Sequence, residues 1–482
     1  VAKQQCAGSI QLPLNNVGVM ALDFKGKEGI ATSIGHAPMA ALIDVKAGSI
    51  NAIGEALSNI VFAPLENGLQ SVSLSANWMW ACKNKGEDAR LYNAVEACSD
   101  FAINLGINIP TGKDSLSMKQ KYSDGEVIAP GTVIISATAH CSDITQVVEP
   151  VFQTSGGSIY YINLSQDSYK LGGSSFAQTL NKIGTETPTI KDTTFFKKTF
   201  NLIQDLIKNN QIVAGHDIGS GGLITTLLEM CFANVNLGAT INFDSFTEKD
   251  LIKILFSENI GIVIQSKDDN VLEKALSGVE YFKLGTVANN GILNVSNFQF
   301  QISTLRDTWF KTSYLFDQKQ TKNNKAKERF DNYKNQPLQY TFPKNSNTKY
   351  PTYNISNGAR PKAAIIREKG SNSEREMANA MYLAGFDVKD IHMTDLILGR
   401  ETLEDIQFIG AVGGFSNSDV LGSAKGWAGA FKYNEKARIA LEKFYQRDDT
   451  LSLGVCNGCQ VMVELGLVYP EHSIQPRMLH NE

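Results

Sequence analysis

The chain has 482 residues, 43% hydrophobic and 20% charged, which is the composition of an ordinary globular protein. Its 45 basic and 49 acidic residues give a net charge of −4, so the overall charge does not indicate binding to nucleic acid or to an anionic membrane. A chain of this length is too long to fold around one hydrophobic core, so we expect three domains.

Cysteine usage and hydropathy indicate the compartment. The seven cysteines are scattered, which is not the pattern of a disulfide framework. The most apolar segment, residues 127–141, falls short of the roughly 18 residues of a membrane helix and contains Pro130 and Gly131. There is no signal-peptide pattern and no initiator Met, which suggests that the sequence begins partway along a longer protein. We expect a cytoplasmic protein with no membrane segment.

The first domain is expected over residues 1–150, where β-branched runs alternate with helical periodicity. We predict strands at 17–24, 40–45 and 132–139, and helices at 49–63 and 87–105.

A second domain is expected over residues 151–315. Its predicted strands are 158–164, 212–216 and 261–265, and its predicted helices are 195–208, one from Leu223 onward, and 251–256.

The composition changes at about residue 316. Residues 316–350 contain eight basic and three acidic residues, with no glycine–aromatic pattern that would favour nucleic-acid binding, so residues 316–358 are predicted to be a solvated linker. Residues 359–482 follow a regular strand–helix–strand pattern, with strands at 363–366, 388–391, 408–412 and 451–455 and a helix at 373–384. This alternation predicts a doubly wound parallel sheet, and the whole chain is expected to be a multidomain α/β and α+β protein.

The sharpest local motif is Gly454-Val455-Cys456-Asn457-Gly458. A predicted buried strand runs into Cys456 and an apolar helix leaves it, and small residues two places before and after relieve crowding around a nucleophile on such a turn. The dipole of the helix favours a thiolate. Two alternatives stay open: Cys456 and Cys459 could form a redox or metal-binding pair, or Cys456 could be an inert structural residue.

Three polar features of the first two domains suit phosphate or cation binding. Glu55 and Asn59 lie one helical turn apart, opposite an apolar stripe, and two such oxygen donors suit Mg²⁺, although the same pair is typical of a solvated helix face. The glycine-rich turn from Gly219 to Gly222 opens a helix and can approach an anion closely. The segment containing Lys113 is similar to a phosphate-binding loop but lacks its spacing.

Several blocks resemble a known family. Gly-x-Cys-x-Gly-x-Gln at 454–460 is similar to the nucleophile motif of class I glutamine amidotransferases. The segments 360–377, 392–396 and 412–428 resemble the phosphoribosylformylglycinamidine synthase family, as do 54–59, 74–79, 110–119, 216–223 and 255–258. The resemblance implies the family's second synthetase repeat (a half-barrel domain and an α/β domain covering the nucleotide), followed by a glutaminase domain that stops before the His and acid of its triad.

The resemblance also implies site residues. Glu55, Asn59 and Asp217 match Mg²⁺ ligands, and Lys113 and Gly219 match positions near the ATP or ADP. Cys456 matches the nucleophile, with the backbone N–H groups of Gly414 and Asn457 as an oxyanion hole. Three residues depart from the family pattern: Asn16 stands where an Asp is usual, Gly219 where a Ser is usual, and Ser418 where a Gly is usual.

The function that follows is part of an ATP- and glutamine-dependent ligase that converts formylglycinamide ribonucleotide to formylglycinamidine ribonucleotide. The expected partners are glutamine, ATP, that substrate and a missing N-terminal repeat, with a homodimer of this piece as a further expectation. Because the triad is incomplete, we expect the piece alone to be inactive. An alternative is a non-catalytic scaffold that holds a structural ADP–Mg²⁺. A synthetase of the CTP synthase type would need a P-loop domain, for which we find no pattern.

Overall fold

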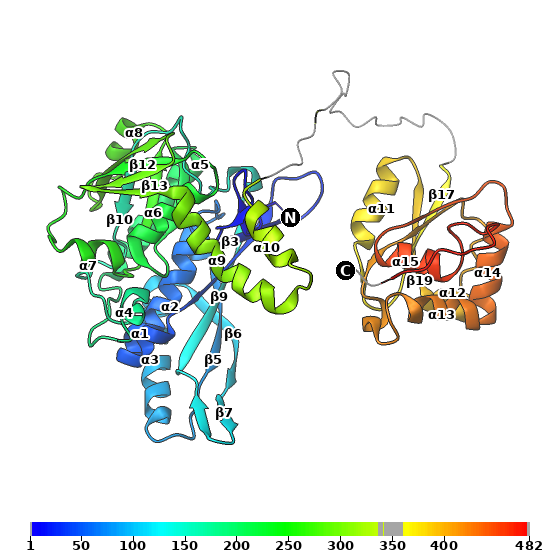
Figure 1. The fold of residues 1–482 in the computed structure, drawn as a ribbon, viewed down its shortest axis with the longest axis horizontal. Helices are drawn as coiled ribbons and strands as arrows, with labels where there is room; N and C mark the ends of the chain where they lie inside the picture. Colours follow the sequence, from blue (N-terminus) through cyan, green and yellow to red (C-terminus); the bar gives the residue numbers. More distant parts are fainter. Residues whose placement is uncertain (1, 336–340, 342–359, 480–482) are drawn as a thin grey trace. The chain divides into compact units, whose positions relative to one another are not determined.

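The computed structural model describes residues 2–335, 341 and 360–479. The chain divides into two compact units, Val1–Gln339 and Tyr340–Glu482. The first unit contains two large sheets and the second contains one (Figure 1). No helix in the described part of the chain has the length and apolar character needed to cross a membrane.

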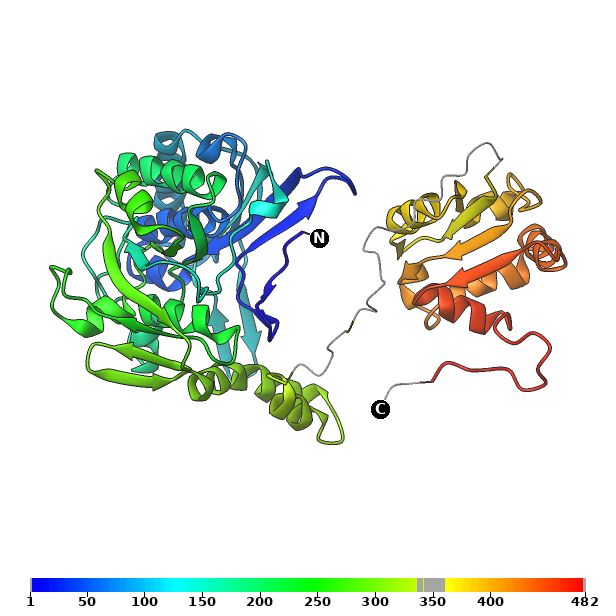
Figure 2. The ribbon, with the colours of Figure 1, turned by 90° about the horizontal axis from the view of Figure 1, so that it is seen from above.

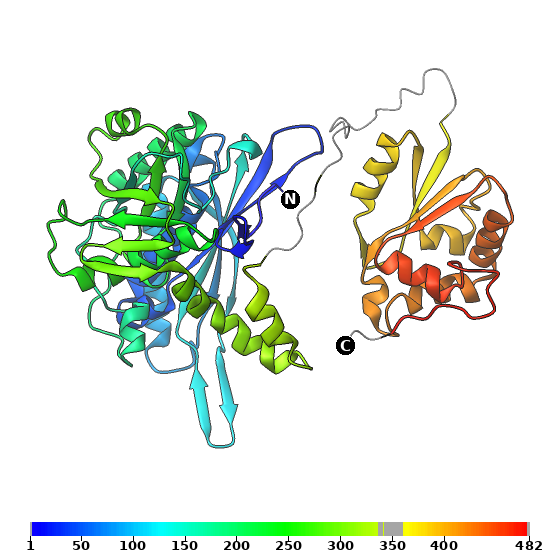
Figure 3. The ribbon, with the colours of Figure 1, turned by 45° about the horizontal axis from the view of Figure 1, so that its top comes forward.

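The first sheet of the N-terminal unit has five strands in the order β3-β4-β9-β5-β6. Neighbouring strands are antiparallel, except that β5 and β6 are parallel. A hairpin of β7 and β8 extends beyond the sheet (Figure 3). The bounds are β3 Val17–Ala21, β4 Gly29–His36, β5 Ser73–Met79, β6 Asn108–Ser115, β7 Lys119–Tyr122, β8 Gly125–Ile128 and β9 Thr132–Cys141.

Helices α2 (Val45–Ile60) and α3 (Glu87–Leu105) share a core with one face of this sheet. Close approach of α2 depends on Gly35 of β4, where an added Cβ would lie 2.3 Å from the carbonyl oxygen of Ala52. The other face of β4 carries exposed apolar side chains, among them Ile30 and Ile34. Within the described residues of the N-terminal unit, the sheet is therefore covered on one side.

The strand predicted at residues 40–45 is wrong. Pro38–Ile43 forms helix α1, with proline in its first turn, and Asp44 then caps α2 by accepting from the backbone N–H groups of Lys46 and Ala47. A short apolar run has no periodicity that separates a strand from a helix. Here Pro38 favours the start of a helix and Asp44 caps the next one, so the run is helical.

The second sheet has seven strands in the order β11-β13-β10-β14-β12-β15-β16. Strand β10 is buried on both faces: Tyr160 and Ile162 join the core that contains α2, whereas Ile159 and Tyr161 join a core on the far side. The bounds are β10 Ile159–Ile162, β11 Ile212–Asp217, β12 Gly238–Ile241, β13 Ile262–Ser266, β14 Phe282–Ala288, β15 Ile292–Val295 and β16 Phe298–Gln301.

Helices cover both faces of this sheet. Residues of α5 (Thr193–Lys208) and α8 (Asp269–Ala275) belong to the first core, and those of α6 (Gly222–Phe232) and α7 (Leu251–Phe256) belong to the second. A short helix, α4 (Ser175–Thr179), lies in the connection between β10 and α5.

Helices also occupy the start of the segment predicted to be a linker. Helix α9 (Ile302–Gln320) runs past residue 316, and α10 (Lys325–Asn332) follows it. The composition is polar, but Phe310, Phe330 and Tyr333 stack between the two helices and hold them together. Most of the remaining predicted linker lies outside the described residues.

The C-terminal unit is a four-stranded parallel sheet in the order β19-β17-β20-β22, with helices on both sides (Figure 2). The predicted doubly wound sheet is confirmed. Its elements are β17 Lys362–Arg367, β18 Ser371–Asn372, α11 Glu374–Leu383, β19 Asp387–His392, α12 Met393–Leu398, β20 Phe408–Ala411, β21 Gly413–Gly414, α13 Lys425–Tyr433, α14 Glu435–Tyr445, β22 Leu451–Gly454 and α15 Asn457–Glu464.

The strand that leads to Cys456 is not buried, contrary to the sequence prediction. Strand β22 lies at one edge of the sheet, and Leu451 and Leu453 are exposed. An apolar run predicts burial only if a further layer covers it, and the described residues supply none at this edge.

Candidate functional site

Glu55 and Asn59 project from α2 toward the end of β4. One carboxylate oxygen of Glu55 accepts from the backbone N–H of His36 at 2.7 Å, and the side-chain amide of Asn59 donates to the carbonyl of Ile34 at 2.9 Å. Asn59 is 4% exposed, and its Oδ1 has no hydrogen-bond partner. The pair is therefore not a solvated helix face.

Asp217 ends β11 and is buried. Its Oδ1 accepts from the side-chain amide of Asn16 at 2.8 Å and lies 2.9 Å from His216 Nδ1. Its Oδ2 is buried without a hydrogen-bond partner. Asn59 and Asp217 thus each present one unsatisfied oxygen, an arrangement that is costly unless a ligand completes it.

His216 connects Asp217 to a second acid. Its Nε2 lies 3.4 Å from Glu229 Oε2, and the other carboxylate oxygen of Glu229 accepts from the indole N–H of Trp309 at 3.0 Å. Burial lowers the pKa of His216, but hydrogen bonding and charge attraction from Asp217 and Glu229 outweigh it and raise the pKa to about 10. The buried ring is therefore positively charged at neutral pH.

Three carboxylates converge near α2. Burial, opposed by the hydrogen bond from His36 and reinforced by the negative charges of Asp217 and Glu258, raises the pKa of Glu55 to about 8. Glu258 is itself held by the backbone N–H groups of Ser175 at 2.8 Å and Gly221 at 2.7 Å. Such mutual repulsion would be relieved by a bound cation.

Two cavities meet at Glu55. A cavity of about 780 Å³ lies on the uncovered face of the five-stranded sheet and is lined in part by Asn16 and Asn59. A smaller one, of about 130 Å³, is lined in part by Gly219 and Glu258, and His36 and Glu55 border both. Within the described ranges, no group of three or more His, Cys, Asp or Glu side chains is placed to hold a metal, so a cation here would also need Asn59 and oxygens of a ligand.

The other two residues expected near a nucleotide separate in the structure. Gly219 borders the smaller cavity, and an added Cβ would meet only Asp217 Oδ2 at 3.4 Å, so space does not exclude the serine usual in the family. Lys113 lies exposed on the edge strand β6, donates to Ser115 Oγ at 2.6 Å and lines neither cavity. Sequence reasoning did not assign His36, Glu229 or Glu258 to the site, although Glu258 belongs to a matched block.

The second candidate centre is Cys456, which follows the carboxyl end of β22 and caps α15. Its backbone has φ 54° and ψ −112°, a strained conformation for a residue with a side chain, and the side chain is exposed. The neighbouring glycines are required for this turn: a Cβ on Gly454 would lie 2.6 Å from the carbonyl oxygen of Gly458, and one on Gly458 would lie 2.1 Å from that of Ala411. This is the geometry of a nucleophile elbow.

The loop after β20 lies beside Cys456. An added Cβ on Gly413 would be 3.7 Å from the Cys456 sulfur, and Gly414, with φ 113°, pairs with Ser371 in the short β18–β21 ladder. Asn457 begins α15, where the first N–H groups have no partner within the helix. Ser418, which replaces the usual glycine, has φ 55°, a conformation that favours glycine.

Three domain models match the chain in order. They are the FGAR-AT PurM_N-like domain over residues 1–140, the C-terminal domain of AIR synthase related protein over 156–296, and the CobB/CobQ-like glutamine amidotransferase domain over 360–482. Fold and sites together therefore define a synthetase repeat of the AIR synthase type joined to a glutamine amidotransferase domain.

Curated relatives identify the family to which the chain belongs within this class. The probable phosphoribosylformylglycinamidine synthase of Arabidopsis thaliana, described as chloroplastic/mitochondrial, is 40% identical over 506 residues, covering 100% of this chain and 35% of the relative. The human phosphoribosylformylglycinamidine synthase is 38% identical, covering 97% and 36%. The chain belongs to the phosphoribosylformylglycinamidine synthase family and spans about a third of the length of these relatives.

Among solved structures, T. maritima PurL complexed with FGAR is similar at 16% identity and a TM-score of 0.49, covering 61% of this chain and 48% of that one.

Proposed function

We propose that this chain forms part of a ligase that uses ATP and glutamine to convert formylglycinamide ribonucleotide to formylglycinamidine ribonucleotide, acting in the cytoplasm. The names of the full-length relatives support this activity, as do the glutamine amidotransferase and AIR synthase matches. The observation that carries the proposal is the strained, exposed Cys456 beside the Gly413–Gly414 loop.

In this proposal Cys456 is the nucleophile of the glutaminase step. Its sulfur attacks the amide carbon of glutamine, forming a thioester and releasing ammonia, and water then hydrolyses the thioester to glutamate. The backbone N–H groups of Gly414 and Asn457 stabilise the negative oxygen of the tetrahedral intermediates. The ammonia replaces the amide oxygen of the substrate after ATP has activated that oxygen, giving ADP and phosphate.

The test is labelling with a glutamine analogue that carries an electrophilic carbon in place of the amide. We expect one adduct per chain, mapped to Cys456 by mass spectrometry, and none in Cys456→Ser. The matched control is Cys459→Ser, which should label normally. Equal labelling of Cys459, or loss of labelling in Cys459→Ser, would instead support a paired-cysteine role.

The synthetase repeat is proposed to hold Mg²⁺ and ADP, or ATP, in a site with little turnover. The unsatisfied oxygens of Asn59 and Asp217 and the raised pKa of Glu55 fit a hard cation, with phosphate oxygens completing its shell. The cation would offset the phosphate charge. Gly219 would approach the phosphates, and Lys113 would take part only if a further chain covers the uncovered face of the sheet.

This second proposal is tested by denaturing the purified chain and measuring the released nucleotide and metal. We expect close to one ADP and accompanying Mg²⁺ per chain, and neither from Asp217→Asn. If nucleotide remains bound in Asp217→Asn, then Asp217 is not a ligand of the proposed site. Rapid ATP hydrolysis by the wild-type chain would contradict a holding role.

A further inference from the structure

Part of the wall of the smaller cavity comes from the long connection between β10 and α5. We name residues 168–188 of this connection the strap. It lies against α2, with Glu55 and Glu258 bordering the same cavity. The strap residues that line the cavity are Gly172, Gly173, Ser175, Gln178, Thr187 and Pro188.

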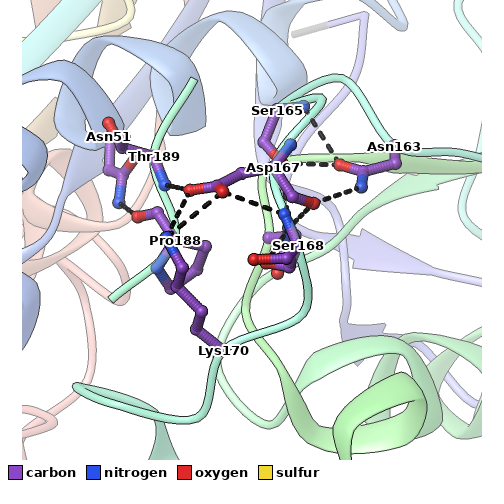
Figure 4. Close-up of polar contacts among 9 residues, drawn as sticks. Asn51, Asn163, Ser165, Asp167, Ser168, Lys170, Pro188 and Thr189 are labelled. Atoms are coloured by element: carbon purple, nitrogen blue, oxygen red, sulfur yellow. Dashed lines mark hydrogen bonds and ion pairs between the residues drawn. The ribbon is translucent and has the colours of Figure 1, made fainter. Parts of the chain in front are cut away.

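Asp167 joins the two ends of the strap. One carboxylate oxygen accepts from the backbone N–H of Thr189 at 3.1 Å, and Lys170 Nζ donates to both oxygens at 3.0 and 3.2 Å (Figure 4). Burial opposes the charge on Asp167, but hydrogen bonds from Lys170 and Thr189 keep its pKa below the usual range. Its backbone carbonyl is held in turn by the side-chain amides of Asn163 and Asn259.

The peptide group between Pro188 and Thr189 links Asp167 to α2. Its N–H donates to Asp167, and its carbonyl accepts from the side-chain amide of Asn51 at 2.8 Å. The hydrogen bonds run in a line from Asp167 through this peptide to Asn51 (Figure 4). Because N–H and C=O point in opposite directions across a trans peptide, fixing one end orients the other.

The orientation of Asn51 follows from this line. A carbonyl oxygen only accepts hydrogen bonds, so Asn51 must turn its NH₂ toward Pro188 and its Oδ1 the other way. Asn51 is 5% exposed, lines the smaller cavity, and its Oδ1 is buried with no hydrogen-bond partner. Asn51 lies one helical turn before Glu55, so its unsatisfied acceptor Oδ1 is close to the proposed cation site.

We propose that Asn51 is a specificity-determining residue of this site and that Asp167 positions it. Oδ1 of Asn51 accepts a hydrogen bond from a neutral donor on the nucleotide, either a ribose hydroxyl or the amino group of the base. A cavity of about 130 Å³ holds a group of that size. The proposal deepens the nucleotide-binding function above and rests on it.

The experiment first removes co-purified nucleotide and metal by dialysis against EDTA, and then measures dissociation constants by calorimetry for ADP, 2′-deoxyADP and IDP in the presence of Mg²⁺. In the wild-type chain we expect the analogue that lacks the donor to bind about tenfold or more weakly than ADP, because it leaves Oδ1 unsatisfied. If 2′-deoxyADP binds weakly, the donor to Asn51 is the ribose hydroxyl. If IDP binds weakly, the donor is the amino group of the base. In Asn51→Leu the three constants should converge. The matched control Asn93→Leu, a half-buried asparagine of α3 that lines neither cavity, should keep the wild-type ranking.

Asp167→Asn tests the positioning role separately. We expect it to reduce the discrimination between ADP and the analogue and to raise hydrogen exchange at the Thr189 N–H, while circular dichroism stays unchanged. Unaltered discrimination in both Asn51→Leu and Asp167→Asn overturns the inference and leaves the nucleotide site standing. A wild-type chain that binds none of the three nucleotides overturns both.

Discussion

At the scale of single residues, the candidate site in the N-terminal unit contains one group of charges that repel each other and one group that attract each other. Glu55 lies near Asp217 and Glu258, whereas the charge of His216 is balanced by Asp217 and Glu229. The first arrangement costs stability and the second contributes it, so the two respond to pH in opposite ways.

Glu55→Gln should stabilise the protein when no divalent cation is present. The folded-state pKa of Glu55 is raised from 4.5 to about 8, so its ionised form is disfavoured by folding and wild-type stability falls as pH rises across that interval. We expect the variant to exceed the wild type by roughly 2–4 kcal/mol at pH 9 and by nothing below pH 4.5. Urea unfolding in EDTA measures this difference, and equal stability at every pH would contradict it. Added Mg²⁺ and ADP should favour the wild type instead.

Glu229→Gln should destabilise the protein near neutral pH. The pKa of His216 is raised from 6.5 to about 10, so its ion pairs contribute fully below pH 6.5 and are lost as pH rises through about 10. Removing one acid from this buried group should cost about 1–3 kcal/mol at pH 7, and less above pH 10. Glu96→Gln, which alters an exposed pair with Lys46, is the control and should change unfolding free energy by at most about 0.5 kcal/mol. Similar losses in both variants would contradict a special role for Glu229.

At the scale of elements, the two sites depend on close contacts between a helix and a strand. Gly35 allows α2 to reach β4, which brings Glu55 to the backbone N–H of His36. Gly458 allows α15 to begin against β20, which sets Cys456 on its turn. In each case backbone atoms are the neighbours of the missing Cβ, so a larger side chain cannot be accommodated by a rotamer change.

Gly458→Ala should abolish labelling of Cys456 by the glutamine analogue and lower the unfolding temperature of the C-terminal unit. The added methyl would lie 2.1 Å from the carbonyl oxygen of Ala411, so helix or strand must move. Gly429→Ala in α13 is the control, because its added Cβ would meet only a ring carbon of Tyr433 at 3.8 Å. That variant should label normally and gain about 0.5–1 kcal/mol from helix propensity. Normal labelling in Gly458→Ala would show that the turn tolerates a side chain.

At the scale of the whole molecule, the described part of the N-terminal unit leaves one face of its five-stranded sheet uncovered. Met20, Ile30 and Ile34 on β3 and β4 are 61%, 43% and 56% exposed, which is unusual for apolar residues grouped on one surface. Strand β6 is also an edge of this sheet. Apolar exposure and an open edge together favour association.

We therefore expect the isolated chain to form a dimer through this face. Light scattering after gel filtration at micromolar concentration should give twice the chain mass, and Ile34→Lys should shift it toward monomer because a buried lysine lacks a partner. Ile103→Lys, at an exposed position of α3, should leave the mass unchanged. A monomeric wild-type chain would contradict the prediction.

Local patterns in the sequence determined much of the fold and the turn that carries Cys456. The bounds of α3 and α7 agree with their predicted ranges, because apolar periodicity and capping are local properties. The elbow at Cys456 was predictable for the same reason, since its glycines act within two residues of the nucleophile.

Only the tertiary structure decided what depends on distant partners. Glu55, Asp217 and Glu258 come from α2, β11 and the segment after α7, and no periodicity shows that their charges meet. The amide of Asn51 is oriented by a peptide 137 residues away. The exposure of β22 and the helical start of the predicted linker likewise follow from which surfaces pack together. Burial and hydrogen bonding between remote segments are properties of the assembled fold, so residue pattern alone does not fix them.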